Sequence, residues 1–345
     1  MIKMRRNSYY RQHVLDYGKD LDFVWLKNKT IMITGVTGLI GAALADLLLL
    51  KNESENLNLH IIGVGRSRDR ALQRLNYTWY NSKAFSFWEQ DIGKTFRNEP
   101  ENIDIIIHAA SNAYPAVFAK FPVETMLANF IGTKALLDIA VSNNATFLLV
   151  SSGEVYGETD VSVKKENDYG YINILNPRSC YPNSKRAAET LCASYIDEYA
   201  ANAIIARLSH VYGPTMTDSD NRVSSEFIRC AHLRKPLVLH STGLTIRSYT
   251  YVLDACSGIL CALKNGISGE AYNVSDERKI ISIRDMAKKI SQVAKVEYDF
   301  HKQIDYGASG ITQQVMSGQK LRNLGWNCRY DFDMGLRETL RSLED

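Results

Sequence analysis

A glycine-rich turn near the N-terminus constrains the fold more than any other feature. An apolar run of strand length, residues 30–34, leads directly into this turn, and an apolar segment of helical length follows it. Gly35 permits a tight turn, Gly38 lets the backbone reach a pyrophosphate, and Gly41 lets helix and strand pack closely. A purely structural turn would not need three glycines at this spacing. The pattern predicts a dinucleotide site at a helix N-terminus, contacted by Gly35, Thr37, Gly38, Leu39, Ile40 and Gly41.

The rest of the first half alternates between strand-like and helix-like segments. Strands are expected at 30–34, 59–64, 84–89, 103–108, 146–151 and 203–208, and helices at 39–51, 68–76, 123–143 and 184–202. This alternation is typical of parallel strands joined by crossover helices. It predicts an α/β fold with a Rossmann-type doubly wound parallel sheet over residues 29–210. A smaller substrate-binding lobe follows over 211–345, with some strands free to return to the sheet, and residues 1–28 form a polar, partly helical extension.

Composition narrows the range of partners. The chain has 41 Lys and Arg against 38 Asp and Glu, so its formal charge of +3 gives no reason to expect nucleic acid or a membrane. No apolar run reaches the length of a bilayer span, and no signal-peptide core is present. The six cysteines form no CxxC pair and no zinc spacing with histidine, so we expect reduced thiols and no metal. The sequence therefore indicates a cytoplasmic globular protein.

The end of the second predicted strand bears on which dinucleotide is bound. An acidic residue normally stands there when the adenosine ribose has a free 2′-hydroxyl. This chain has Gly65 at that position, followed by Arg66 and Arg68, which could neutralise a 2′-phosphate. NADP is thereby favoured over NAD. The alternative, that both arginines only form a solvated turn, stays open.

Three later segments complete the predicted cofactor site. One follows the third predicted strand and could meet the adenine ring, and another closes the fourth strand with small residues where a cofactor needs room. A lone asparagine in the next predicted helix is either solvated or braces the chain near the reactive residues. The cofactor contacts expected from these segments are Asp91, Ile92, Ala109, Ala110, Ser111 and Asn129.

A candidate catalytic group lies where the fifth predicted strand ends and the next helix begins. Tyr181 and Lys185 are four residues apart, so a helix presents both on one face, where the ammonium can stabilise a phenolate and lower its pKa. Ser152 at the strand end supplies a hydroxyl for a substrate oxygen. Such a trio suits hydride transfer: the tyrosine takes a proton from an alcohol while a nicotinamide takes the hydride. Tyr181 and Lys185 would therefore also contact the cofactor.

Together these motifs resemble the extended short-chain dehydrogenases/reductases of the NAD-dependent epimerase/dehydratase family, over residues 28–340. Within it the chain is most similar to UDP-glucuronate decarboxylases, in the stretches 169–173, 176–181, 185–189, 207–208, 212–214, 247–252, 273–274 and 324–326. The resemblance implies that a nucleotide-diphosphate sugar is modified through a 4-keto intermediate. It also implies a homodimer built from the helices near 123–143 and 184–202. It assigns catalysis to Ser152, Glu154, Tyr181 and Lys185, and substrate binding to Asn173, Arg178, His210 and Arg247, the last at a phosphate.

Glu154 bears on the reaction. In the resembling enzymes a glutamate here accompanies decarboxylation or 4,6-dehydration, whereas typical 4-epimerases lack it, so chemistry beyond C4 is favoured. The alternative is a structural acid hydrogen-bonded to the turn. Gly153 departs from both subfamilies, because decarboxylases have serine there and many dehydratases have aspartate. His210 also departs, since asparagine is usual at its position.

Several functions remain open on this basis. UDP-glucuronate-type decarboxylation is the favoured function, because oxidising a uronic acid at C4 gives a β-keto acid that loses carbon dioxide readily. The alternatives are a nucleotide-sugar 4,6-dehydratase, a 4-epimerase and an NADPH-dependent 4-keto reductase. A non-catalytic, cofactor-sensing protein on the same fold is less favoured, because Tyr181 and Lys185 are both present.

Overall fold

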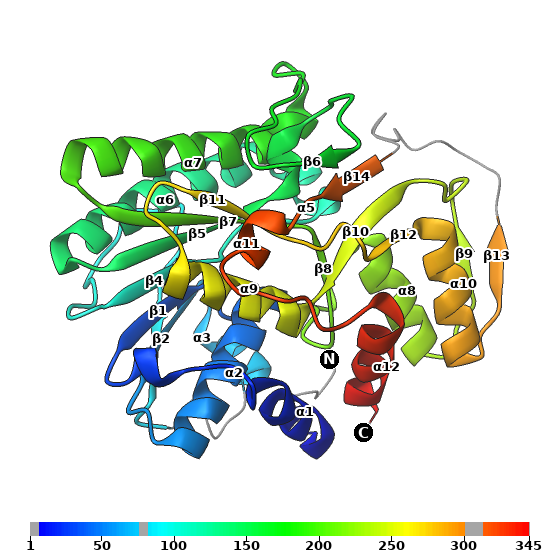
Figure 1. Ribbon diagram of the computed structural model, residues 1–345, viewed down its shortest axis with the longest axis horizontal. Helices are drawn as coiled ribbons and strands as arrows, with labels where there is room; N and C mark the ends of the chain where they lie inside the picture. The colour runs from blue at the N-terminus through cyan, green and yellow to red at the C-terminus, as the bar shows by residue number, and fades with distance from the viewer. Residues whose placement is uncertain (1–6, 76–81, 301–312, 345) are drawn as a thin grey trace.

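The larger of the two main sheets is a seven-stranded parallel sheet. The computed structural model describes residues 7–75, 82–300 and 313–344, and orders this sheet β11-β7-β5-β4-β1-β2-β3 (Figure 1). Because β1 pairs with both β2 and β4, the order of the strands reverses at β1, as in a doubly wound sheet. This confirms the predicted α/β, Rossmann-type fold. The strands are β1 (Thr30–Thr34), β2 (His60–Gly65), β3 (Phe85–Glu89), β4 (Ile105–His108), β5 (Thr146–Ser152), β7 (Asn202–Leu208) and β11 (Ala271–Val274).

Helices cover both faces of this sheet and form two separate apolar cores. Figure 1 shows α6 and α7 above the sheet and α2 below it. Side chains of β5 alternate between the cores: Phe147 and Leu149 pack with α6 and α7, whereas Leu148 and Val150 pack with α2 and α9. The helices are α2 (Leu39–Glu55), α3 (Arg68–Arg74), α5 (Pro115–Lys120), α6 (Pro122–Asn143), α7 (Cys180–Tyr199) and α9 (Val252–Asn265).

The second half of the chain builds smaller sheets beside the large one. One has the order β12-β10-β14-β6 with β8 paired to β10, and another joins β13 to β9. The strands of these two smaller sheets are β6 (Val163–Lys164), β8 (His210–Tyr212), β9 (Leu237–Leu239), β10 (Ile246–Tyr251), β12 (Ile280–Ser282), β13 (Tyr298–Phe300) and β14 (Gln313–Met316). The remaining helices of this half of the chain are α8 (Val223–His232), α10 (Ile283–Ala294), α11 (Gln319–Arg322) and α12 (Phe332–Leu343). Three 3-10 turns lie earlier in the described chain: η2 (Val24–Leu26), η3 (Gly153–Tyr156) and η4 (Pro177–Ser179). β11 returns to the large sheet, and the domain boundary after residue 210 stays a prediction.

Most predicted elements begin or end within a few residues of the observed ones. α7 starts at Cys180, four residues before the predicted start, because Pro182 lies in the first turn, where its missing N–H is no loss. The helix predicted at 68–76 ends at Arg74, and residue 76 lies outside the described residues. Within the described residues no helix is both long and apolar enough to cross a bilayer.

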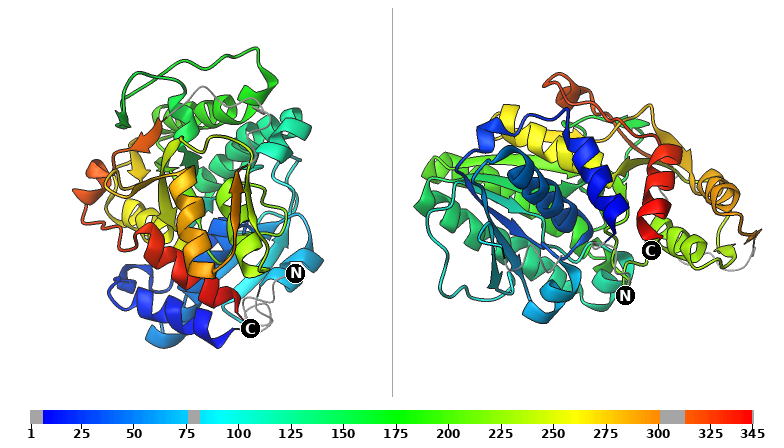
Figure 2. Two further views of the ribbon diagram at one scale, coloured as in Figure 1. Left: turned by 90° about the vertical axis from the view of Figure 1, so that its right-hand side faces the viewer. Right: turned by 90° about the horizontal axis from the view of Figure 1, so that it is seen from below.

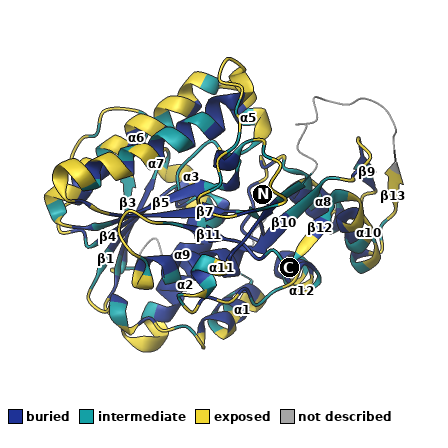
Figure 3. Ribbon diagram, turned by 45° about the horizontal axis from the view of Figure 1, so that its top comes forward, coloured by how far each residue is buried: buried dark blue, intermediate teal, exposed yellow. Residues whose placement is uncertain are grey.

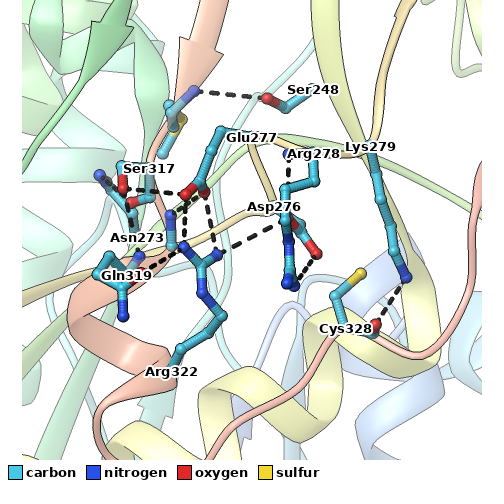
Figure 4. A network of polar contacts seen from close by, with 12 residues as sticks. Ser248, Asn273, Asp276, Glu277, Arg278, Lys279, Ser317, Gln319, Arg322 and Cys328 are labelled. Atoms are coloured by element: carbon cyan, nitrogen blue, oxygen red, sulfur yellow. Dashed lines mark hydrogen bonds and ion pairs between the residues drawn. The ribbon is translucent and has the colours of Figure 1, made fainter.

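An ion-pair network fixes the C-terminal strand β14 and helix α11 to the end of β11 (Figure 4). Glu277 accepts a hydrogen bond from Gly318 N at 2.9 Å and pairs with the Arg322 guanidinium, which lowers the pKa of Glu277 to about 2 even though burial opposes this. Asn273 Nδ2 donates to Ser317 O at 3.0 Å. These contacts place β14 beside β10, the strand that carries Arg247.

The N-terminal extension forms helix α1 (Ser8–Gly18), which packs against α2 and α12 (Figure 2). Its buried face is polar. Tyr10 Oη donates to Asp46 Oδ2 of α2 at 2.9 Å, and His13 Nε2 lies 3.0 Å from Tyr251 Oη at the end of β10. Tyr17 Oη donates to Asp254 Oδ1 in the first turn of α9 at 2.8 Å. The extension therefore joins the glycine-turn helix to the segment that carries Arg247.

Tyr17→Phe tests whether this helix is an integral part of the fold. The hydroxyl also lies 2.8 Å from Ser257 Oγ, and its loss leaves the buried Asp254 carboxylate with one donor fewer. We expect the free energy of unfolding to fall by about 1–3 kcal/mol in urea denaturation. Tyr171→Phe, at a tyrosine that is 65% exposed, is the matched control and should change little. Equal small losses in both variants would contradict a structural role for the Tyr17 hydroxyl.

Candidate active site

The glycine-rich turn lies directly against the end of β4. Gly35 has φ +68°, and a Cβ there would lie 2.8 Å from Ala110 Cα, so only glycine fits this left-handed position. A Cβ at Gly41 would collide with Gly35 O. Gly38 caps α2 without a side-chain hydrogen bond, so the helix N-terminus keeps its N–H groups for an anion. This cradle fits the pyrophosphate of a dinucleotide, although the individual contacts stay predictions.

At the tip of β2 the structure adds a carboxylate that the sequence analysis missed. β2 and β3 pair so that Gly65 lies opposite Glu89. Arg68 Nε lies 3.9 Å from Glu89 Oε2, and its guanidinium lies 5.9 Å from the centre of the Phe87 ring. Arg66 is exposed. The tip thus holds one arginine drawn towards a carboxylate and one that faces solvent.

Asp91, Ile92 and Asn129 occupy different environments beside the cofactor cradle. Asp91 Oδ1 accepts a hydrogen bond from Gly93 N at 3.1 Å, and Ile92 is buried. Asn129 is fully buried, which excludes the solvated alternative. Its Oδ1 accepts from Ser111 Oγ at 2.8 Å, and its Nδ2 donates to Ser184 Oγ at 2.9 Å. Asn129 therefore braces the end of β4 against α7, as the second interpretation of this residue predicts.

Tyr181, Lys185 and Ser152 come together at the junction of β5 and α7. Burial lowers the pKa of Lys185 to about 8, and its Nζ donates to Val150 O at 2.9 Å. Burial raises the pKa of Tyr181 to about 12, and the Glu154 charge raises it further, whereas the neighbouring Ser152 hydroxyl lowers it. The lowered tyrosine pKa expected from the spacing is therefore not seen in this arrangement, where the lysine hydrogen-bonds to a backbone carbonyl. The phenol holds its proton at neutral pH.

Glu154 and Arg178 form a two-point ion pair next to Tyr181. Arg178 Nη1 donates to Glu154 Oε2 at 3.1 Å, and Nη2 donates to Oε1 at 3.3 Å. The Arg178 guanidinium also lies 4.4 Å from the centre of the Phe118 ring, whose centre lies 5.4 Å from that of Tyr181 at an interplanar angle of 14°. Phe118, which the sequence analysis missed, thus contacts both the Arg178 guanidinium and the Tyr181 ring. The side chain of Glu154 thus has its partner in η4 and not in its own turn.

A group of basic side chains lies around His210, and one of them, Arg222, is close enough for its charge to act on Tyr181. Arg247 on β10 has a buried Nε with no hydrogen-bond partner among the described residues. Burial, with Arg247 and Arg222 nearby, holds the pKa of His210 well below its usual value, so this imidazole is neutral. Arg222 is held by Asp220, with Nη2 2.6 Å from Oδ2, and its charge acts on both Tyr181 and Tyr249. Two guanidinium groups and a neutral imidazole suit a phosphate or diphosphate.

Two of these neighbours escaped the sequence analysis, and one predicted residue lies apart from the rest. Arg222 sits in a loop and carries no motif. Tyr249 could have been found from the sequence, because it lies two residues after Arg247 on β10 and residues two apart on a strand share one face. Asn173 is exposed on the loop before η4, where its Oδ1 accepts from Leu175 N at 3.2 Å.

A buried charge network joins α7 to β5 and β7. Glu189, four residues after Lys185 on α7, accepts from Ser151 Oγ at 2.5 Å and from Arg207 Nη2 at 2.7 Å. Arg207 Nη1 also donates to Tyr156 Oη at 3.1 Å. The charge of Glu189 raises the pKa of Lys185 against the effect of burial. Its spacing from Lys185 could have identified it from the sequence.

Comparison with known proteins points to one family. The sequence profile of the NAD dependent epimerase/dehydratase family matches residues 31–275. UDP-glucuronic acid decarboxylase 3 of Arabidopsis thaliana is 32% identical over 319 residues, which cover 92% of this chain and 89% of that protein. UDP-glucuronic acid decarboxylase 1 of Xenopus tropicalis is 28% identical over 314 residues, 90% of this chain and 71% of that protein.

Solved structures share the fold at lower identity. A dTDP-glucose 4,6-dehydratase from Streptomyces venezuelae with NAD and TYD bound superposes with a TM-score of 0.77 at 21% identity, covering 91% of this chain and 96% of the other. A UDP-glucuronic acid 4-epimerase from Bacillus cereus in complex with UDP-glucuronic acid and NAD gives 0.74 at 23% identity, covering 91% and 98%. These matches extend the fold comparison over almost the whole chain.

Lys185→Met tests the electrostatics of the buried lysine. Because burial lowers its pKa from 10.5 to about 8, the unfolded chain binds more protons than the folded one between these values. The wild type should therefore gain roughly 1–3 kcal/mol of stability relative to Lys185→Met as the pH rises through this window. Below this pH window the difference in stability between the wild type and Lys185→Met should be constant. Denaturant unfolding over this pH range measures the difference, with Lys235→Met, at an exposed lysine, as control, and a pH-independent difference would refute the burial argument.

Proposed function

This chain belongs to the NAD-dependent epimerase/dehydratase family, and on that premise we propose that it decarboxylates a uronic acid carried on a nucleoside diphosphate. The observation that carries the proposal is the Arg178–Glu154 pair beside Tyr181. The decarboxylases named among the relatives support it. Arg222 and Arg247 supply the cationic surface that a diphosphate requires.

The proposed reaction has three steps: oxidation at C4, loss of carbon dioxide and reduction at C4. A bound nicotinamide supplies the oxidant, and afterwards the reductant, for C4 of the sugar. Tyr181 has to lose its proton first, which the positive charge of an oxidised nicotinamide would favour; as phenolate it then takes the C4 hydroxyl proton in the oxidation and gives it back in the reduction, while the Ser152 hydroxyl hydrogen-bonds to O4. In the 4-keto acid between these steps the C5–C6 bond breaks, and carbon dioxide leaves. The electron pair moves to an enolate with its charge on O4, and C5 then takes up a proton.

The chain's own groups suit decarboxylation better than dehydration. Elimination of water needs a base for the C5 proton and an acid for the departing hydroxyl. Both carboxylate oxygens of Glu154 accept hydrogen bonds from Arg178, so this carboxylate is already engaged. A Cβ at Gly153 would collide with Met316 Sδ, so an acidic side chain at position 153 would have to displace that thioether. Loss of carbon dioxide from a β-keto acid needs neither group, and Arg178 has further N–H donors for a substrate carboxylate beside the two that it gives to Glu154.

The products of a small panel of nucleotide sugars test this reaction. We expect UDP-glucuronate to lose carbon dioxide and UDP-glucose and dTDP-glucose to be unchanged in mass, as followed by mass spectrometry. Loss of water from a glucose nucleotide would favour the dehydratase. A product of unchanged mass but altered stereochemistry would favour the epimerase, and a requirement for added NADPH would favour the reductase.

Tyr181→Phe tests the assigned base. Only the proton acceptor is removed, so turnover should fall by a factor on the order of 10²–10⁴ while cofactor binding survives. Lys185→Met should weaken both turnover and cofactor binding, because we expect a lysine at this position to contact the nicotinamide ribose as well. Tyr199→Phe, at an exposed tyrosine near the far end of α7, is the control and should keep its rate. A Tyr181→Phe variant with most of its activity would remove the assignment.

The tip of β2 sets the cofactor preference, and we propose that it accepts NADP at least as well as NAD. Arg66 is the free contact for a 2′-phosphate, since Arg68 is drawn towards Glu89. Arg66→Ala should weaken NADP about tenfold and leave NAD unchanged, because one charge-assisted hydrogen bond is lost. Glu89→Gln should strengthen NADP binding. Binding titrations decide it, and tight NAD, weak NADP and no response to Arg66→Ala would mean a solvated turn.

An exposed apolar stripe on α6 supports the homodimer that the sequence implies. It comprises Val123, Met126, Leu127, Phe130 and Ile131, at helical spacing on one face. Figure 3 shows that the outer faces of α6 and α7 are largely exposed in the single chain. A second copy of this chain buries such a stripe by forming a four-helix bundle.

Disruption of this stripe should separate the subunits. We expect light scattering at micromolar concentration to give a dimer for the wild type and a monomer for Phe130→Glu. Val24→Glu, at a residue that is 68% exposed away from α6, should remain dimeric. A monomeric wild type would refute the dimer.

A further inference from the structure

The segment 213–222, between β8 and α8, crosses from the smaller sheet to the glycine-rich turn. Thr215, which is buried, donates its hydroxyl to Leu39 O in the first turn of α2 at 2.7 Å. Met216, also buried, follows it. The segment therefore touches the peptide groups that form the cofactor cradle, although it belongs to the other half of the chain.

One arginine holds this segment and the turn together. Arg74, the last residue of α3, donates from Nη2 to Thr215 O at 2.7 Å and from Nε to Thr37 O at 3.2 Å. Nη1 lies 3.4 Å from Met216 O. A guanidinium has five N–H donors in a rigid plane, so a single side chain can bridge two backbones in this way. Neither Arg74 nor Thr215 is needed for the chemistry proposed above.

The other end of the segment reaches the catalytic residues. Ser219 Oγ lies 3.1 Å from Tyr114 Oη, in the loop between β4 and α5. Asp220 then holds Arg222, whose charge acts on Tyr181. The segment thus contacts the glycine-rich turn through Thr215 at one end, and at the other end it contacts Tyr114 through Ser219 and lies near Tyr181 through Arg222.

We propose that residues 213–222 form a strap across the cofactor site and that the Arg74–Thr215 contact controls how fast the cofactor leaves. The inference rests on the proposed binding of a dinucleotide at the glycine-rich turn. A dinucleotide seated there can leave only after the strap separates from the turn, which breaks the bonds of Arg74 and Thr215. The strap therefore keeps one cofactor bound over many turnovers, and it couples the cradle to Arg222 on the substrate side.

The rate of cofactor release tests the strap without any sugar substrate. The protein is loaded with NADH and chased with excess NAD, and the loss of bound-NADH fluorescence gives the dissociation rate. We expect Arg74→Ala to release NADH at least tenfold faster and Thr215→Val, which removes only the hydroxyl contact, several-fold faster. Arg70→Ala, at an exposed arginine on the same helix, should match the wild type.

The outcomes separate the strap from the proposed reaction. If Arg74→Ala does not fold, the near-isosteric Thr215→Val decides the question. Release at the wild-type rate in every folded variant would overturn the strap and leave the decarboxylation proposal intact. Faster release from a protein that decarboxylates nothing would support the strap and refute that reaction. A wild type that binds no dinucleotide would overturn both.

Discussion

The close approach of Gly35 to Ala110 is the contact on which the rest of the site depends. It brings the turn after β1 against the end of β4, where Ala110 N donates to Thr34 Oγ1 at 3.1 Å. From the next residue a chain of hydrogen bonds runs through Ser111, Asn129 and Ser184 to the carbonyl of Tyr181. A side chain at position 35 would push these elements apart. The glycine-rich turn and α7 are therefore positioned by one continuous set of contacts.

Charge at the site is arranged in pairs before any ligand arrives. Arg178 and Arg222 are each held by a carboxylate, Glu154 and Asp220, so their guanidinium planes are already oriented. Behind them burial makes Lys185 a weaker base than usual and keeps Tyr181 protonated. The site thus holds oriented, ion-paired guanidinium groups and a tyrosine whose proton is lost only when the surrounding charge changes.

The sequence predicted what depends on local pattern and missed what depends on tertiary contact. The parallel sheet, the glycine-rich turn and the Tyr181–Lys185 face all follow from periodicity and spacing. The strands β12, β13 and β14 are only three or four residues long, and partners distant in the sequence determine them. Arg74 and Arg222 act from a helix end and a loop, so no motif marks them. The direction of the Tyr181 pKa shift was missed because desolvation is set by packing.

Transfer of a C4 label tests the central claim, that one bound cofactor oxidises and then reduces the same carbon of a uronic acid nucleotide. UDP-glucuronate deuterated at C4 is converted in the presence of excess unlabelled NAD and NADP, and the product and the free cofactors are analysed by mass spectrometry. The account predicts a decarboxylated sugar that retains deuterium at C4, with no label in the free cofactors. A product without deuterium, or label released into the free cofactors, would contradict it.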